Sequence, residues 1–185
     1  MTALASRGQL RASFVRWALL TVPACVLLGY LSGAVAQSGP ENPWFAALAK
    51  PAIFPPPVWF GIVWTVLYAM MGFALALVCA AWGARGRTAA IVLFALQFAV
   101  NLAWTPTFFG AHQIAAALAM IAVLDVLVVA TIVLFWRVRR LAGALLLPYL
   151  AWILFATLLN YEFLRLNPHA DGTAGESGAV QRIEI

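Results

Sequence analysis

The sequence predicts an all-α membrane protein, a bundle of five transmembrane helices with a proline-rich loop between the first and the second. Hydrophobic residues make up 65% of the 185 residues and charged residues only 9%. A soluble domain has about 25% charged residues, so this chain could not cover itself with a solvated surface, and we expect the lipid bilayer as its main partner. Five apolar segments each approach the roughly 20 residues needed to cross a bilayer: 15–36, 58–82, 88–109, 113–136 and 141–165.

The first apolar segment allows two interpretations. Arg7, Arg11 and Arg16 precede a run that ends in Ala34-Val35-Ala36, which resembles a signal-peptide cleavage site. The run is longer than the 7–15 residues usual for a signal peptide, and its removal would leave four helices. We therefore favour a retained helix, which makes 1–13 a basic N-terminal segment and 14–167 a five-helix domain. The polar, Gly-rich tail 168–185 is predicted to be disordered.

Arginine placement predicts the orientation. With five spans, the N-terminus shares one side of the membrane with the second and fourth connections, which carry Arg85, Arg87, Arg137, Arg139 and Arg140. The opposite side has Lys50, Arg165 and Arg182. The positive-inside rule then places the N-terminus in the cytoplasm, and this charge bias favours an inner membrane. Because the basic residues lie between apolar runs and form no extended patch, nucleic acid is not an expected partner.

The loop 37–57 ends in three consecutive prolines, Pro55, Pro56 and Pro57. None can lie inside a helix, because each lacks an N–H and clashes with the preceding turn. The second apolar segment follows at once and brings Trp59, Trp64 and Tyr68. This order predicts a rigid lid over one end of the bundle, with flat aromatic rings beneath it.

The third segment has two contrasting faces. Gln97, Asn101 and Trp104 fall at i, i+4 and i+7, on one face of a helix. If this polar face points into the bundle, the opposite small-xxx-small stripe points outward and suits a homodimer interface, although alanine is also simply common in such helices. The stripe consists of Ala95, Ala99 and Ala103.

The fifth segment repeats the pattern with aromatic residues. Tyr149, Trp152, Ala156 and Asn160 share one face by the same spacing. A large ring beside a small alanine leaves room for a flat ligand. Ordinary packing and the aromatic belt at the membrane interface are the alternative explanation.

No residue pattern predicts a metal site or a required cofactor. Asp125 is an isolated carboxylate in the middle of the fourth segment, so a packing role is favoured over a proton or ion relay. His112, at one end of that segment, and His169, in the tail, are too far from mid-bundle to bind a buried haem iron. Cys25 and Cys79 lie in apolar runs without CxxC spacing and are expected to be buried free thiols.

Three stretches together resemble one known family: KPAIFPPPVWFGIVWTVLYAMMG at 50–72, QFAVNLAWTPTFFG at 97–110 and LPYLAWILFATLLNYEFLRLN at 147–167. They are similar to the tryptophan-rich sensory protein/translocator protein family (TspO/MBR family, peripheral-type benzodiazepine receptor). The resemblance implies a five-helix membrane bundle, commonly dimeric. It also implies a pocket beneath the first loop for porphyrins, sterols and benzodiazepine-type or isoquinoline ligands.

The resemblance assigns roles to individual residues. Trp64 and Trp152 match the two tryptophans that line the pocket, which in some bacterial members are tied to light-dependent porphyrin breakdown. Ala156 matches a small residue of the wall. The ligand-binding set expected here is Trp44, Phe45, Pro55, Trp64, Tyr68, Asn101, Trp104, Trp152 and Ala156.

The chain also departs from the family. Phe45 stands where relatives have a tyrosine-like residue. PPPVWFGIVW stands where many have PPxWVFGPVW, so Trp59 is shifted by one position and Ile62 replaces a proline. Leu158 or Leu159, with Tyr161 and Arg165, satisfies a loose cholesterol-contact pattern, and an interfacial Tyr/Arg anchor explains the same residues.

The expected function is a membrane receptor or sensor of porphyrin-type tetrapyrroles such as protoporphyrin IX. Two alternatives belong to other classes. One is an enzyme that degrades porphyrin in light with Trp64 and Trp152 as redox-active side chains. The other is a transporter of small hydrophobic molecules, although the sequence has no internal repeat of the kind many transporters show. Outer-membrane placement, proposed for some relatives, is the alternative to the inner membrane.

Overall fold

The computed structural model describes residues 7–173, and all regular structure within them is helical. The predicted all-α membrane class is confirmed, because five helical stretches are long and apolar enough to cross a membrane. The elements in chain order are α1 (Arg7–Val35), α2 (Pro43–Ala47), α3 (Val58–Cys79), α4 (Arg87–Thr105), the π-helical turn η1 (Pro106–Gly110), α5 (Ile114–Val138), α6 (Arg140–Leu145) and α7 (Leu147–Leu166).

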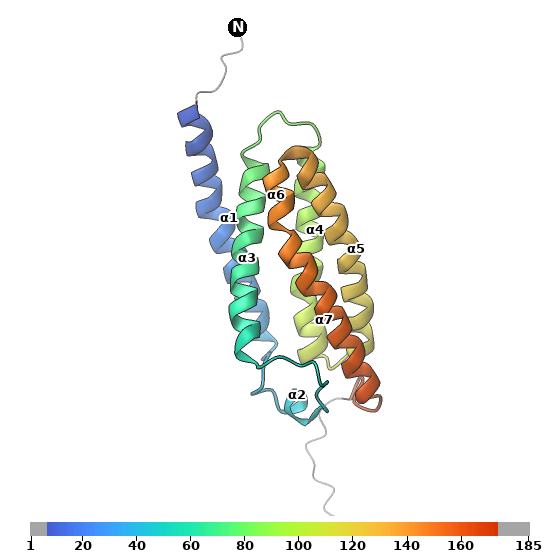
Figure 1. Ribbon diagram of the computed structural model, residues 1–185. Coiled ribbons are helices and arrows are strands. Elements are labelled where there is room, and N and C mark those ends of the chain that lie inside the picture. Colours follow the sequence, from blue (N-terminus) through green and yellow to red (C-terminus); the bar gives the residue numbers. More distant parts are fainter. Residues whose placement is uncertain (1–6, 174–185) are drawn as a thin grey trace, which may run out of the picture.

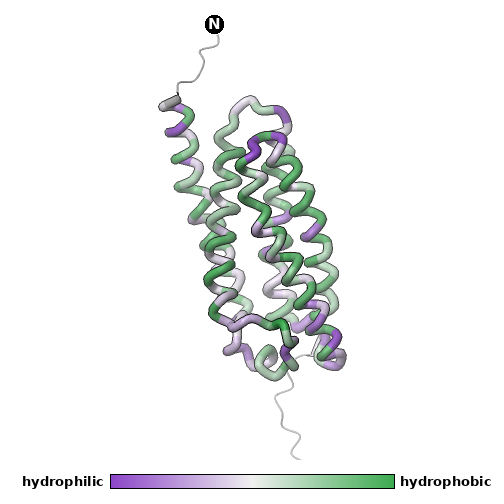
Figure 2. The backbone as a smooth tube through the Cα atoms, viewed as in Figure 1, coloured by the Kyte–Doolittle hydropathy of each residue, from purple (hydrophilic) through white to green (hydrophobic). Residues whose placement is uncertain are grey.

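The long helices run side by side, and their connections alternate between two ends of the bundle (Figure 1). We call one end the arginine end, because its α3–α4 and α5–α6 connections carry Arg85 and Arg139. The other is the loop end, where residues 36–57 with α2 lie across the bundle beside the α4–α5 connection. Hydrophilic residues gather at both ends and hydrophobic residues cover the length between them (Figure 2), as a bilayer requires.

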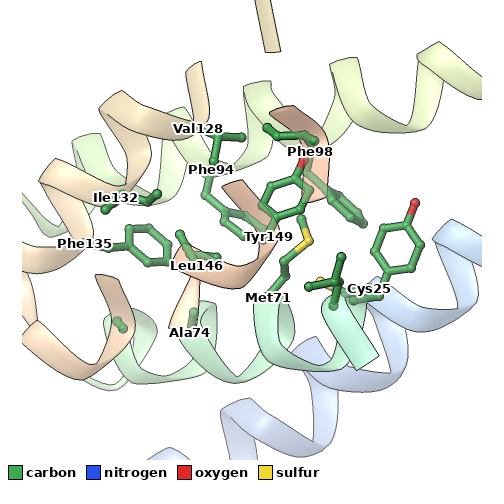
Figure 3. Close-up of a cluster of buried hydrophobic side chains, with 14 of the residues drawn as sticks. Cys25, Met71, Ala74, Phe94, Phe98, Val128, Ile132, Phe135, Leu146 and Tyr149 are labelled. Carbon is green, nitrogen blue, oxygen red and sulfur yellow. The ribbon is translucent and has the colours of Figure 1, made fainter. Parts of the chain in front are cut away.

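The tightly packed core lies toward the arginine end. Met71 of α3, Phe94 of α4, Phe135 of α5 and Tyr149 of α7 are each at most 3% exposed and converge there (Figure 3). The rings of Phe94 and Phe135 stack with centroids 5.7 Å apart. In the same region α6 packs against α3, so a helix near the end of the chain contacts one near its beginning.

Helix α1 lies on the outside of the bundle and packs mainly against α3 (Figure 1). The two helices approach closely at Gly72, where an added Cβ would lie 2.5 Å from the Cα of Val22. The Thr21 hydroxyl donates to the Gly72 carbonyl at 2.7 Å. A glycine at this contact thus lets two backbones meet, the usual way in which membrane helices associate.

Two predicted spans are interrupted by proline. The third does not continue as an α-helix to residue 109, because Pro106 has no N–H for the carbonyl of Leu102 and the chain forms η1. The Ser32 hydroxyl of α1 donates to that carbonyl instead, at 2.6 Å. The fifth span is divided into α6 and α7 at Leu146, two residues before Pro148.

The loop end contains an element that the sequence did not predict. Helix α2 begins at Pro43, whose fixed φ suits a first helical position, and Asn42 caps it by accepting the N–H of Phe45 at 2.9 Å. Pro55–Pro57 lie outside the helices, directly before α3. Helix α1 starts within the predicted basic segment, whereas residues 1–6 and most of the predicted tail, with Arg182, lie outside the described residues.

Candidate functional site

A cavity of about 640 Å³ lies at the loop end, between α1, α3, α4 and α7 and beneath the loop. This volume falls within the roughly 300–1,000 Å³ of small-molecule sites. None of the residues that line the cavity carries a charge. Its walls are mainly apolar and aromatic, so it suits a hydrophobic ligand.

Two of the predicted tryptophans, one on α3 and one on α7, line this cavity. Trp64 on α3 lines it and stacks on Tyr68, with ring centroids 5.2 Å apart and planes 27° from parallel. Trp152 on α7 lines it too and meets Phe60 edge-on at 5.8 Å. Ala156, one turn beyond Trp152, also belongs to the wall and keeps that side open. The family resemblance singles out Trp64, Trp152 and Ala156, and helical spacing by itself places Trp152 and Ala156 on one face.

The indole N–H groups of the site differ in their partners. Trp104 donates its N–H to Oδ1 of Asn160 at 3.2 Å, and the Asn160 amide donates to the Ile114 carbonyl at 3.0 Å. The N–H of Trp152 is buried and has no protein acceptor. An unpaired buried donor costs free energy, which distinguishes Trp152 from Trp104.

The floor of the cavity is a polar contact between α3 and α4. The Tyr68 hydroxyl donates to Oδ1 of Asn101 at 2.9 Å. Asn101 does not border the large cavity but a smaller void of about 20 Å³ next to it. Tyr68 reaches this position because Gly29 of α1 leaves space for its ring: an added Cβ would lie 2.1 Å from Tyr68 Cε2.

The loop residues of the predicted set separate into two groups. Phe45 is 5% exposed and lines the cavity from α2. Trp44 and Pro55 do not line it. Trp44 points elsewhere and stacks on His112 with centroids 4.5 Å apart, because neighbouring residues of a helix project about 100° apart.

Lys50 closes the C-terminal end of α2 and does not enter the cavity. Its ammonium donates to the carbonyls of Phe45 and, at 2.9 Å, Leu48, and it lies 4.3 Å from the centroid of the Phe45 ring. Partial burial lowers the pKa of Lys50 below its ordinary value. A cation here fits the negative end of the helix dipole.

The sterol pattern is not brought together on one surface. Leu159 is 4% exposed and lines the cavity, whereas Tyr161 is 51% exposed on the other side of α7. Arg165 follows Tyr161 by one turn and pairs with Glu162 at 2.7 Å. Residues two apart in a helix project about 200° apart, which explains the separation.

The two faces of α4 lie as the sequence pattern suggested. Gln97 is fully buried and Asn101 is 4% exposed. The alanine stripe is exposed on the opposite face, and the homodimer stays a prediction. The stripe comprises Ala95, Ala99 and Ala103.

The remaining candidates lie outside the cavity. Asp125 accepts a hydrogen bond from the Thr157 hydroxyl at 2.9 Å and thereby joins α5 to α7. Cys25 and Cys79 are buried and unpaired, as predicted. Within residues 7–173, no group of three or more His, Cys, Asp or Glu side chains is placed to hold a metal ion.

Sequence reasoning missed the contribution of α1 to the site. Gly29, Tyr30 and Gly33 all border the cavity. The Gly29-xxx-Gly33 spacing is the small-xxx-small signal that could have identified this face. The phenylalanines around the rim were missed as well, since nothing in their spacing separates them from ordinary packing residues; they are Phe54, Phe60, Phe108, Phe109 and Phe163.

Comparison with known proteins agrees with the architecture. A family model described as the TspO/MBR family matches residues 21–166. A tryptophan-rich protein TspO from Chlorobaculum tepidum is 39% identical over 150 residues, which cover 80% of this chain and 94% of that protein. Protein CrtK from Rhodobacter capsulatus is 37% identical over 146 residues, covering 78% and 89%. The human translocator protein is 40% identical over 142 residues, covering 76% and 84%.

Proposed function

Because the chain belongs to the TspO/MBR family, we propose that this multi-pass membrane protein is a receptor or sensor that binds porphyrin-type tetrapyrroles in the cavity beneath the loop. The observation that carries the proposal is the uncharged cavity of about 640 Å³ between Trp64 and Trp152. A flat apolar macrocycle gains about 25 cal/mol for each Å² that it removes from water, without any metal bond. Relatives named tryptophan-rich sensory protein support the sensory role.

The same cavity suits other flat or elongated hydrophobic molecules. Sterols and benzodiazepine-type or isoquinoline ligands are secondary candidates, and relatives named translocator protein keep transport among the alternatives. For a sterol we assign Leu159, which faces the cavity, a larger role than Tyr161 and Arg165, which do not line it.

Light-dependent porphyrin breakdown is the second candidate function. It is favoured by the stacking of Trp64 on Tyr68 and by the edge contact of Trp64 with Tyr149 at 6.3 Å. A ligand in the cavity would border a group of oxidisable rings that continues into the core. In this case Trp64 and Trp152 would be the residues that react.

For topology, we propose a cytoplasmic N-terminus and the bacterial inner membrane. The arginine end carries Arg85, Arg87, Arg137, Arg139 and Arg140, whereas the loop end has Lys50 and Arg165 beside Glu41, Glu162 and Asp171. Basic residues are retained on the cytoplasmic side. The cavity and its loop then open toward the outer side of that membrane.

Titration of the purified protein with protoporphyrin IX, followed by tryptophan fluorescence, tests the proposal. We expect saturable quenching in the wild type and at least about ten-fold weaker binding in Trp64→Phe/Trp152→Phe, since the larger indole surface is lost on both walls together. The matched control is Trp82→Phe/Trp136→Phe, which also removes two indoles but lies outside the cavity.

Three outcomes can be distinguished. Linear quenching that is equal in all three proteins would mean that porphyrin only partitions into the detergent, and the proposal would fail. Saturable binding without a light-induced product supports the receptor. A defined product that forms under illumination, and only when both cavity tryptophans are present, supports the enzyme.

A further inference from the structure

Residues 167–173, which follow α7, lie against the loop; we call them the C-terminal strap. The Asn167 side chain forms a pair of hydrogen bonds with the backbone of Ala49, accepting its N–H at 2.8 Å and donating to its carbonyl at 3.0 Å. One side-chain amide thus satisfies both backbone groups of a single loop residue. The Asn167 amide also donates to the Phe163 carbonyl at 2.9 Å, which fixes it to the last turn of α7.

The strap continues to the α4–α5 connection. The N–H of Gly172 donates to the His112 carbonyl at 2.8 Å, and His112 Nδ1 lies 3.0 Å from the Thr173 carbonyl. Asp171 accepts the N–H of Ala115 at 3.0 Å, at the start of α5, where a carboxylate caps the helix. Gly172 has a φ of +73°, a conformation that favours glycine.

His112 links these contacts back to the loop. Its ring stacks on Trp44 of α2, 4.5 Å between centroids. Ala170 of the strap packs against the buried cluster that contains Phe45 and Phe163. The strap therefore ties together the loop, the α4–α5 connection and the end of α7.

Phe163, whose carbonyl accepts from Asn167, lines the cavity, and so do Phe45 and Phe54 of the loop; Asn167, Asp171 and Gly172 of the strap do not. The loop residues form the roof, and they contact the bundle through aromatic rings, such as that of Phe45 with Phe109 at 5.0 Å, and through a hydrogen bond from the Asn42 amide to the Phe109 carbonyl at 3.3 Å. Aromatic contacts have little directionality, whereas the strap adds directional hydrogen bonds to the loop at Ala49 and to the α4–α5 connection at His112.

We propose that the C-terminal strap is a latch that holds the loop closed over the cavity, so that release of the strap controls access from the aqueous side. The latch acts on the rate of entry and exit, not on the shape of the cavity walls. This inference does not depend on which ligand the cavity binds.

A cysteine reporter inside the cavity tests the latch without any ligand. Ala156→Cys places a thiol in the wall, in a chain whose buried native thiols are removed by Cys25→Ala and Cys79→Ala. The protein is placed in lipid nanodiscs and treated with a charged methanethiosulfonate, which does not cross the hydrocarbon. We expect Asn167→Ala/Asp171→Ala to raise the labelling rate about ten-fold, since each lost hydrogen bond contributes roughly a factor of two to ten.

Hydrogen exchange of the loop provides a second readout. The N–H groups of Phe45 and Phe54 bond to Asn42 and Pro51, not to the strap. Faster exchange at these two amides therefore reports opening of the whole loop. Asn167→Asp, which keeps the acceptor and the size of the side chain, replaces Asn167→Ala if the latter lowers the melting temperature by more than a few degrees.

Glu162→Gln is the matched control, because it breaks the exposed pair with Arg165 on α7 without touching the loop. The control should label at the wild-type rate. Equal labelling in the strap variant and the control would overturn the proposal. Faster loop exchange with unchanged labelling would overturn it as well, because access would then run between the helices from the lipid.

Discussion

The two ends of the bundle are built from the same helices but are packed in opposite ways. At the arginine end, small residues allow close approach: Ala74 and Ala142 are fully buried, and an added Cβ on Gly143 would lie 2.8 Å from Trp136. At the loop end, large rings such as Trp64 and Phe60 stand around a cavity that they do not fill. The arginine end is therefore closely packed, whereas the loop end leaves its rings around open space.

This contrast predicts that removing a large side chain from the packed core lowers the free energy of unfolding more than any of the other substitutions described below. Phe135→Ala removes a fully buried ring that stacks on Phe94 and should lower the free energy of unfolding by about 3–5 kcal/mol. Phe60→Ala, on the cavity wall, should cost less than half as much, because its ring already borders empty space. Thermal unfolding of both variants in the same detergent measures the difference. Equal costs would mean that the cavity end is as tightly packed as the core.

Two glycines on the α1–α3 interface sharpen the comparison. Gly72→Ala pushes against the Val22 backbone and should destabilise the protein by about 1–3 kcal/mol. Gly29→Ala pushes against the Tyr68 ring, a side chain that can shift toward the cavity, so it should destabilise the protein less than Gly72→Ala while weakening protoporphyrin IX binding. Melting curves and titrations of both variants test this. If Gly29→Ala binds protoporphyrin IX like the wild type, the position of the Tyr68 ring does not matter for binding.

Substitutions of two cavity tryptophans should have smaller effects, one mainly on stability and the other mainly on ligand binding. Trp104→Phe removes the donor to Asn160 and should cost about 1 kcal/mol of stability. Trp152→Phe removes a donor that has no protein partner, so it should cost less stability than Trp104→Phe, and ligand affinity should fall. Chemical denaturation and titration of the pair measure both quantities. A loss of stability in Trp152→Phe as large as that in Trp104→Phe would contradict the assignment.

The smallest effect is expected on the lipid-facing side of α7. Tyr161 is 51% exposed, and Tyr161→Leu should change stability by less than about 0.5 kcal/mol and leave binding of a sterol probe unaffected. Leu159→Ala, on the cavity wall, should weaken that binding. A radiolabelled sterol binding assay on the two variants decides which face is used. If only Tyr161→Leu weakened binding, the sterol would contact the cholesterol-contact pattern on the lipid-facing side of α7 and not the cavity.

Hydropathy was enough to predict the five spans, because apolar length is a property of each segment taken alone. Helical spacing also predicted which face of α4 is buried, since Gln97 cannot face lipid cheaply. The division at Leu146, the turn after Pro106 and helix α2 were not predicted, although Pro148, Pro106 and Pro43 are local signals for them. How the bundle accommodates such a break depends on partners distant in sequence. For example, the Ser32 hydroxyl of α1 donates to the Leu102 carbonyl that Pro106 leaves without a partner, and this pairing cannot be predicted from either stretch of sequence.

The same limit applies to the candidate site. Trp64, Trp152 and Ala156 could be named from spacing and family resemblance. The role of Gly29 could not be predicted, because Gly29 matters by leaving space for the Tyr68 ring, which belongs to another helix. Trp44 and Phe45 are adjacent in the sequence, and only the placement of α2 determines which of them faces the cavity.

The packing of α6 against α3 has a consequence for the order in which the protein folds. Helices α1 and α3, and likewise α4 and α5, are consecutive spans that contact each other, so each pair can form as soon as its second member has been synthesised. The contact of α6 with α3 joins distant parts of the chain, and contacts of this kind form late. Trp152 and Ala156 follow α6, so the cavity comes into existence only with the final step of assembly. A chain that stalls before that step would be inserted in the membrane and helical, yet unable to bind.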